Sequence, residues 1–240
     1  MTCLFLWYNR LKIWYIYGVR TSMIIFYSIS NLSFLILLIL SSFKGESKTR
    51  LILKTITSLH FCSLAFFAFL QVGLLQNEVF LLIGLGFSLV GDVALGFKYK
   101  SKKAVGLGLF FFTFTQLFYI LYFGVNPRFF MFGLPLLLFG VVFAFKSKKN
   151  PDYNFKGLGI KVGIYASLLG IMVSTACASW SFVLLSSSTL STLGAISFFF
   201  SDFILLHLYF YKHKKTSLLI ATLILYHLGQ NLLALSLWIK

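Results

Sequence analysis

Long apolar segments alternate with short polar connections along the whole chain. Eight segments are each long enough for a membrane-spanning helix, which needs about 20 predominantly apolar residues. They cover residues 23–43, 51–73, 78–97, 104–124, 129–145, 157–179, 188–211 and 216–238. Backbone groups in lipid must find partners within the protein, and runs of this length fit helices rather than the short strands of a membrane barrel. The pattern predicts an all-α, polytopic membrane protein built as a bundle of about eight transmembrane helices.

The connections are too short to hold a separate soluble domain, so we expect residues 23–240 to form a single transmembrane domain. Residues 1–22 are a distinct N-terminal extension that mixes basic residues with Trp and Tyr. Two interpretations remain open. The extension is an interfacial helix, because Trp and Tyr favour the membrane–water boundary, or it is dispensable and Met23 is the true start. We favour a dispensable extension.

The basic residues predict how the bundle sits in the membrane. The 21 Lys and Arg outnumber the five Asp and Glu, which gives a formal net charge of +16. In a soluble protein this excess would suggest a nucleic-acid partner, but here the cations cluster in the odd-numbered connections between apolar segments. Lys and Arg mark the cytoplasmic side. We therefore expect a multi-pass protein, of a bacterial cytoplasmic membrane given the short connections, whose partner is the lipid bilayer and not nucleic acid.

The five acidic residues separate into two groups. Glu46, Glu78 and Asp152 lie at connections or segment ends, where we expect them to be solvated. Asp92 and Asp202 lie inside the third and seventh segments. A carboxylate at the centre of a membrane helix costs about 2.5–3.5 kcal/mol on insertion scales, and intramembrane acids usually serve function. The alternative is that both acids only form structural hydrogen bonds between helices.

Polar residues at helical spacing suggest a shared pocket. Small or polar residues recur every four positions around the first of the two buried acids and so share one helix face: Gly84, Ser88, Asp92 and Gly96. Other segments carry further polar side chains at three- or four-residue steps: Thr113, Gln116, Tyr119, Tyr226, His227, Gln230 and Asn231. Lys54, just inside the second segment, could snorkel to the interface or bind a phosphate.

Motifs for metal or nucleophilic chemistry are lacking. The four histidines form no HxxxH or HExxH pair, and the three cysteines are scattered. A GxSxG nucleophile motif is also missing. We expect no metal and no cofactor.

Several motifs, taken in order, resemble one membrane family. Residues 87–95, Phe-Ser-Leu-Val-Gly-Asp-Val-Ala-Leu, resemble the SLxGD element of the YhhN-type lysoplasmalogenase family. Other landmarks of that family have counterparts at Lys54-Thr55, Gln116 to Tyr119, Tyr165 and Met172, residues 194–202, and Tyr226 to Gln230. The resemblance covers about residues 30–238. Two positions depart from it: Gln116 stands where the family usually has histidine, and Thr55 where it commonly has proline.

The resemblance implies hydrolysis of the vinyl ether bond of a lysoplasmalogen, a lysophospholipid, to a fatty aldehyde and a glycerophospho-headgroup. Protonation of the vinyl β-carbon gives an oxocarbenium ion that water attacks, and two carboxylates in different environments can divide these tasks, as in glycosidases. Asp92 and Asp202 are the candidate catalytic residues. Lys54 is the candidate for holding the substrate phosphate, and the candidate pocket residues are Ser88, Tyr119, Tyr165, Tyr226 and Gln230.

Two other functions remain open on the residues alone. In a proton-coupled transporter the two aspartates would relay protons, although the chain shows neither repeated halves nor a pair of broken helices. In a structural or lipid-binding membrane protein both acids would be inert.

Overall fold

The structure is a computed structural model that describes residues 2–45, 47–73, 75–97, 103–124, 128, 149–155, 158–212 and 215–239. Within residues 2–19, side chains are not described. The described part holds seven α-helices: α1 (Thr2–Ser42), α2 (Lys48–Val72), α3 (Gln76–Gly96), α4 (Lys103–Phe123), α6 (Gly159–Ser179), α7 (Ser187–Phe210) and α8 (Thr216–Ser236). The only β-type pairing in these residues is an isolated bridge between Tyr153 and Tyr211. The predicted all-α class is confirmed.

Each of the seven described helices contains a stretch long and apolar enough to cross a membrane. Seven of the eight predicted segments coincide with these helices, and the eighth, residues 129–145, lies outside the described residues. In α1 the apolar stretch is Arg20–Ser42. The protein is an integral multi-pass membrane protein.

The backbone shows no change of secondary structure at residues 22 and 23, between which we expect the N-terminal extension to end. The helix α1 continues across both positions. Just before the boundary, the guanidinium of Arg20 lies 5.6 Å from the ring centroid of Trp238, beyond the end of α8. The last part of the extension therefore contacts the bundle.

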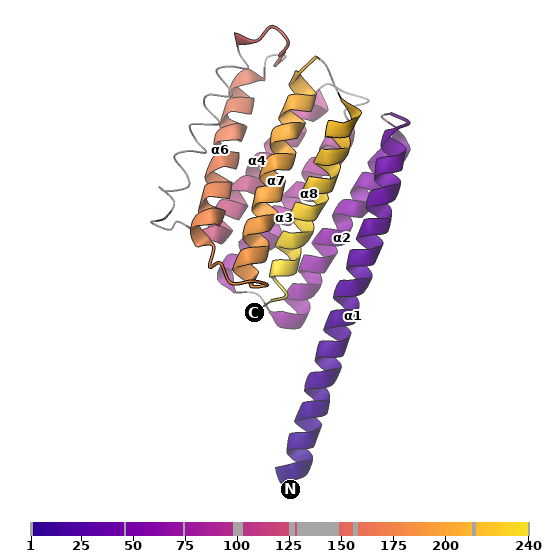
Figure 1. The fold of residues 1–240 in the computed structure, drawn as a ribbon, viewed down its shortest axis with the longest axis vertical. Helices are drawn as coiled ribbons and strands as arrows, with labels where there is room; N and C mark the ends of the chain where they lie inside the picture. Colours follow the sequence, from indigo (N-terminus) through magenta and orange to yellow (C-terminus); the bar gives the residue numbers. More distant parts are fainter. Residues whose placement is uncertain are drawn as a thin grey trace.

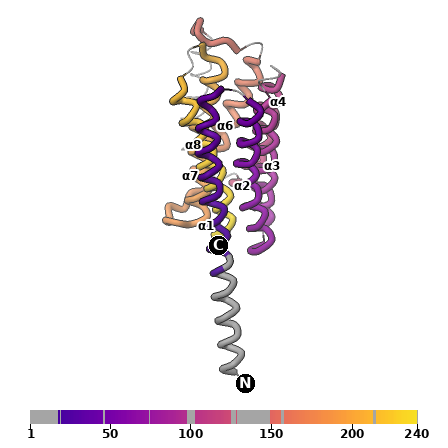
Figure 2. Tube along the Cα trace, turned by 90° about the vertical axis from the view of Figure 1, so that its right-hand side faces the viewer, coloured from indigo at the N-terminus to yellow at the C-terminus, as the bar shows by residue number. Residues whose placement is uncertain are grey.

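Six of the helices form a closed ring in which each packs against the next, in the order α2, α3, α4, α6, α7, α8 and back to α2. α8 also contacts α3 across the ring. α1 lies outside it, against α2 and α8, and Figure 1 shows α1 at one edge of the molecule beside α2. The view in Figure 2, turned by 90°, shows the helices running side by side as one bundle.

Local sequence sets several helix ends. Ser47 begins α2, because its hydroxyl accepts the backbone N–H of Arg50 at 3.2 Å. Gly73 ends the same helix with a positive φ of 70°, a conformation that glycine adopts without steric cost. Ser186 begins α7 in the same way as Ser47 begins α2, by accepting the N–H of Thr189 at 3.1 Å.

Helices α7 and α8 approach each other closely at two glycines. A Cβ on Gly194 of α7 would lie 2.8 Å from the carbonyl oxygen of Gly229 on α8, and the reverse contact has the same distance. These glycines let the two backbones touch, as small residues do at membrane helix interfaces. The register of α7 against α8 is thereby fixed beside the segment that carries Asp202.

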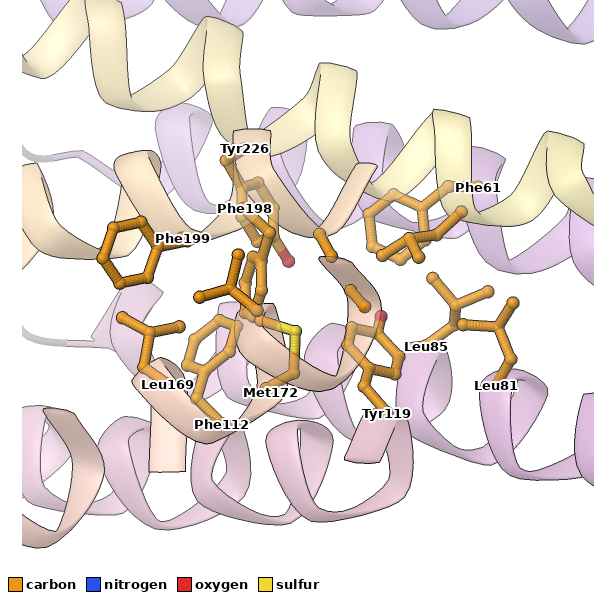
Figure 3. Close-up of a cluster of buried hydrophobic side chains, with 14 of the residues drawn as sticks. Phe61, Leu81, Leu85, Phe112, Tyr119, Leu169, Met172, Phe198, Phe199 and Tyr226 are labelled. Carbon is orange, nitrogen blue, oxygen red and sulfur yellow. The ribbon is translucent and has the colours of Figure 1, made fainter. Parts of the chain in front are cut away.

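Aromatic side chains fill the middle of the ring. Phe112 of α4, Phe198 of α7 and Tyr226 of α8 meet there, with ring centroids 6.1–6.3 Å apart (Figure 3). All three are buried. Two of the three, Phe112 and Tyr226, also line the cavity described below.

Candidate active site

Asp92 of α3 is buried and surrounded by donors from two neighbouring helices. Lys54 of α2 places its Nζ 2.8 Å from Asp92 Oδ1. The hydroxyls of Ser58 on α2 and Tyr226 on α8 each donate to Asp92 Oδ2 at 2.5 Å. Only 1% of the Asp92 side chain is exposed, against 17% of Lys54. A cation and two hydroxyl donors are the setting that stabilises an ionised carboxylate.

A chain of hydrogen bonds extends from this carboxylate deeper into the bundle. The hydroxyls of Tyr226 and Ser88 lie 2.7 Å apart, and Gln230 Nε2 donates to Ser88 Oγ at 3.1 Å. Tyr119 of α4 then donates to Gln230 Oε1 at 2.6 Å. The chain joins α3, α4 and α8 and fixes the orientation of the Tyr226 hydroxyl.

Asp202 of α7 has a different environment. The hydroxyl of Tyr165, on α6, donates to Asp202 Oδ2. The other oxygen, Oδ1, is buried and has no hydrogen-bond partner among the described residues. Asp202 is therefore a buried carboxyl with one oxygen left for a proton, a water molecule or a substrate.

A single cavity joins the two aspartates. Both line a space of about 50 Å³, which is room for a few water molecules. Lys54, Phe112 and Tyr226 are also in its wall. Sequence reasoning had named the two acids without being able to place them together.

The cavity extends from the aspartates towards one end of the bundle. That end is formed by the starts of α2 and α8 and the ends of α3 and α7, and the cavity wall there includes Ser47, Arg50, Gly96 and Tyr209. We call it the basic end, because the described basic connection residues Lys44, Lys48, Lys103, Lys212 and Lys215 lie there. Asp92 lies four residues before the last residue of α3, so the site is nearer this end than the helix centre.

The structure places the six other predicted site residues in three groups around the aspartates. Lys54 and Tyr226 line the cavity together with the aspartates. Ser88, Tyr119 and Gln230 form the hydrogen-bond chain behind Tyr226. Tyr165 is bonded to Asp202 but is not in the cavity wall.

Two residues at this site escaped the sequence analysis. Ser58 bonds directly to Asp92, and Arg50 lines the cavity. Both lie four residues from Lys54 on α2, one after it and one before it, so they share its helix face. The four-residue spacing from Lys54 was the sequence feature that could have identified them.

The predicted positions of the remaining acids also hold where they are described. Glu78 is half-buried at the start of α3, where its Oε2 accepts the backbone N–H of Leu75 at 2.7 Å. Asp152 lies 3.6 Å from Lys212 Nζ in an ion pair outside the helices. Glu46 lies outside the described residues.

Two buried polar side chains near the site have no hydrogen-bond partner in the part of the chain that the structure describes. Gln116 of α4 and His227 of α8 are fully buried, and none of their side-chain nitrogen or oxygen atoms has a hydrogen-bond partner among the described residues. Gln116 and Asp202 are both neighbours of the Tyr165 hydroxyl. His60 instead bonds to Ser30 and to the Ile56 carbonyl, both at 2.8 Å. Within the described residues, no three His, Cys, Asp or Glu side chains form a metal-binding group.

Comparison with known proteins identifies the family. The model of the YhhN family matches residues 49–237, from the start of α2 to just beyond α8. The chain belongs to the YhhN family. The match includes every described residue that we place at the cavity or its hydrogen-bond chain except Ser47. It leaves α1 outside, which agrees with the position of α1 outside the ring. No curated protein and no solved structure matches the chain.

Proposed function

We propose that this YhhN family member is a lysoplasmalogenase-like hydrolase that cleaves a vinyl ether bond. The substrate would be a lysoplasmalogen, and the products a fatty aldehyde and a glycerophospho-headgroup. The observation that carries the proposal is that Asp92 and Asp202 line one cavity in unlike settings. Family membership supports it.

The unlike settings suggest a division of roles. Asp92, with Lys54 and two hydroxyl donors around it, is suited to remain a carboxylate that stabilises positive charge. Asp202, one oxygen of which has no hydrogen-bond partner among the described residues, is suited to carry the proton that the reaction needs. Asp202 is accordingly our candidate general acid.

The reaction then proceeds with one water molecule consumed. Asp202 transfers its proton to the β-carbon of the vinyl ether, and the resulting oxocarbenium ion is stabilised by the Asp92 carboxylate. Water adds to the cationic carbon as a carboxylate takes one of its protons, which gives a hemiacetal. The carbon–oxygen bond to glycerol then breaks as the departing oxygen receives that proton and the hemiacetal hydroxyl returns its own to Asp202. Two carboxyls serve as acid and base in this way in glycosidases.

The other site residues support this pair. Lys54 balances the charge of Asp92 and also lines the cavity. Tyr226 and Ser58 hold the Asp92 carboxylate in place. Ser88, Gln230 and Tyr119 form the hydrogen-bond chain behind Tyr226. Tyr165 orients Asp202.

The direct test is release of aldehyde from a lysoplasmalogen by the purified protein. Asp92→Asn and Asp202→Asn should each lower the rate by at least about 10²-fold, the scale of general acid–base catalysis. Asp152→Asn is the matched control, since Asp152 lies outside the cavity and should keep the wild-type rate. Full activity in both cavity variants would refute the two-carboxylate mechanism.

One observation also fits a proton-coupled transporter. A lysine paired with an aspartate inside a membrane bundle, as Lys54 is with Asp92, is the type of pair that relays protons in transporters. The transporter and the hydrolase can be distinguished by what happens to the lysolipid. Uptake of lysolipid into proteoliposomes without chemical conversion would favour transport, whereas release of aldehyde favours the hydrolase.

A further inference from the structure

Leucines surround the cavity on the basic side of its polar groups. Helices α2, α3, α7 and α8 each bring one polar side chain to the inner part of the cavity: Lys54, Asp92, Asp202 and Tyr226. On each of these helices a leucine of the cavity wall lies three residues nearer the basic end, about 4.5 Å along the helix axis and on the same face. A fifth leucine of the wall lies one turn further out on α8. The five form what we call the leucine collar: Leu51, Leu95, Leu205, Leu219 and Leu223.

The collar lies between two polar regions of the cavity. The aspartates are inside it, whereas Ser47, Arg50 and Tyr209 of the wall lie nearer the basic end than the leucines of their own helices. At the level of the collar, the hydroxyl of Thr222 donates within α8, to the carbonyl oxygen of Leu218 at 2.9 Å. The whole cavity holds about 50 Å³, so the route from the basic end to the aspartates is narrow and passes through hydrocarbon.

Packing holds three of the collar leucines in place. Leu51 fits against Gly96 of α3 and Leu95 against Gly108 of α4, since a Cβ on either glycine would meet the leucine side chain. Leu223 is buried in a cluster with two leucines of α1. The helix α1, which the family match leaves out, therefore supports one side of the collar. The other two collar leucines, on α7 and in the first turn of α8, are half-buried.

We propose that the leucine collar is an apolar barrier that admits neutral and apolar groups to the aspartates and keeps hydrated ions outside. A narrow hydrophobic constriction loses its water and blocks ions, because an ion would have to shed its hydration shell to pass. The hydrocarbon of a lipid meets no such cost among leucines. The barrier also keeps salt from screening the ion pair of Lys54 with Asp92. The inference concerns access to the site and holds whichever reaction follows.

Thiol labelling of the purified protein in detergent measures what passes the collar. Ser201 lines the cavity one residue before Asp202, inside the collar. A Ser201→Cys variant, made after Cys3, Cys62 and Cys177 are changed to Ser, places one thiol there. The probes share one chemistry and differ in charge: methyl methanethiosulfonate is neutral, and its trimethylammonium-ethyl and sulfonatoethyl analogues are a cation and an anion. Using both signs separates exclusion of ions from attraction by the charges of the site.

The barrier should discriminate by charge. Relative to Ser217→Cys, which is exposed outside the collar, Ser201→Cys should react with both charged reagents at least about tenfold more slowly than with the neutral one. Adding Leu219→Asn should remove most of this discrimination, and Leu219→Thr, a milder change, should remove part of it. The matched control is Leu218→Asn, because Leu218 is the neighbouring half-buried leucine and is not among the described residues of the cavity wall. It should keep the discrimination.

Three results would overturn the proposal. Discrimination at Ser201→Cys no greater than at Ser217→Cys would show that the collar is no barrier to ions. Failure of the neutral reagent to label Ser201→Cys would show that neutral groups are excluded as well. Equal discrimination in the Leu219→Asn and Leu218→Asn backgrounds would show that the collar is not its cause. Labelling needs no turnover, so the outcome is independent of whether the protein releases aldehyde.

Discussion

At the scale of single residues, sequence identified the chemical groups of the site but not their partners. Asp92 and Asp202 stood out because carboxyls are costly inside a membrane, and both are buried in the cavity wall. Ser58 and Arg50 did not stand out, because serine is common in helices and Arg50 is at a helix start, where cations are ordinary. Packing between helices decides which face of α2 meets α3. A single sequence does not reveal that face.

The Lys54–Asp92 pair has a consequence for stability. Lys54→Met should destabilise the protein by about 3 kcal/mol, the low end of the range for breaking a buried pair, since part of Lys54 remains exposed. The charge of Asp92 is then left uncompensated. Unfolding of the purified protein by denaturant in a mild detergent measures the change.

A second substitution isolates the pair. The double variant Lys54→Met/Asp92→Asn removes both charges and should be more stable than Lys54→Met alone. If the double variant is instead less stable by the sum of the two single effects, Lys54 and Asp92 do not interact energetically.

At the scale of helices, the apolar pattern predicted seven of the described elements well, because each needs a long uninterrupted run to cross a membrane. The division at residue 22 stays a prediction; helix α1 passes through that position, and no proline interrupts residues 2–42. The close pairing of α7 with α8 depends on Gly194 and Gly229 meeting, which spacing within one helix does not reveal.

The glycine contact between α7 and α8 is testable by adding one methyl group. Gly194→Ala should destabilise the fold by about 1–3 kcal/mol, because its Cβ would lie 2.8 Å from a backbone oxygen that cannot rotate away. Gly86→Ala is the control, since a Cβ there meets nothing within 4 Å. Equal stability of the two variants in thermal unfolding would show that the contact does not matter.

At the scale of the whole molecule, hydropathy predicted a bundle, whereas the ring and its cavity follow from which helices pack together. Helices α2, α3, α7 and α8 contribute the cavity wall near the basic end, although the first two are distant in sequence from the last two. Polar residues on several segments suggested a shared pocket. The cavity brings part of that set together, and Gln116 and His227, also in the set, are not in its wall.

The distribution of basic residues predicts that the basic end faces the cytoplasm. After Cys3, Cys62 and Cys177 are changed to Ser, a Lys212→Cys variant should react with a membrane-impermeant thiol reagent only in opened cells. A Leu184→Cys variant should react in intact cells, since Leu184 is exposed in the connection between α6 and α7, at the other end of the bundle. The reverse pattern of labelling would invert the orientation.

The central claim, that the two aspartates hydrolyse a vinyl ether by protonating carbon, has one most direct measurement. The purified protein is incubated with a lysoplasmalogen in D₂O, and the aldehyde is trapped at once and analysed by mass spectrometry. The account predicts an aldehyde with a single deuterium on the carbon next to the carbonyl, released by the wild type and not by Asp92→Asn or Asp202→Asn. Aldehyde without deuterium, or labelled aldehyde at the wild-type rate from both variants, would contradict it.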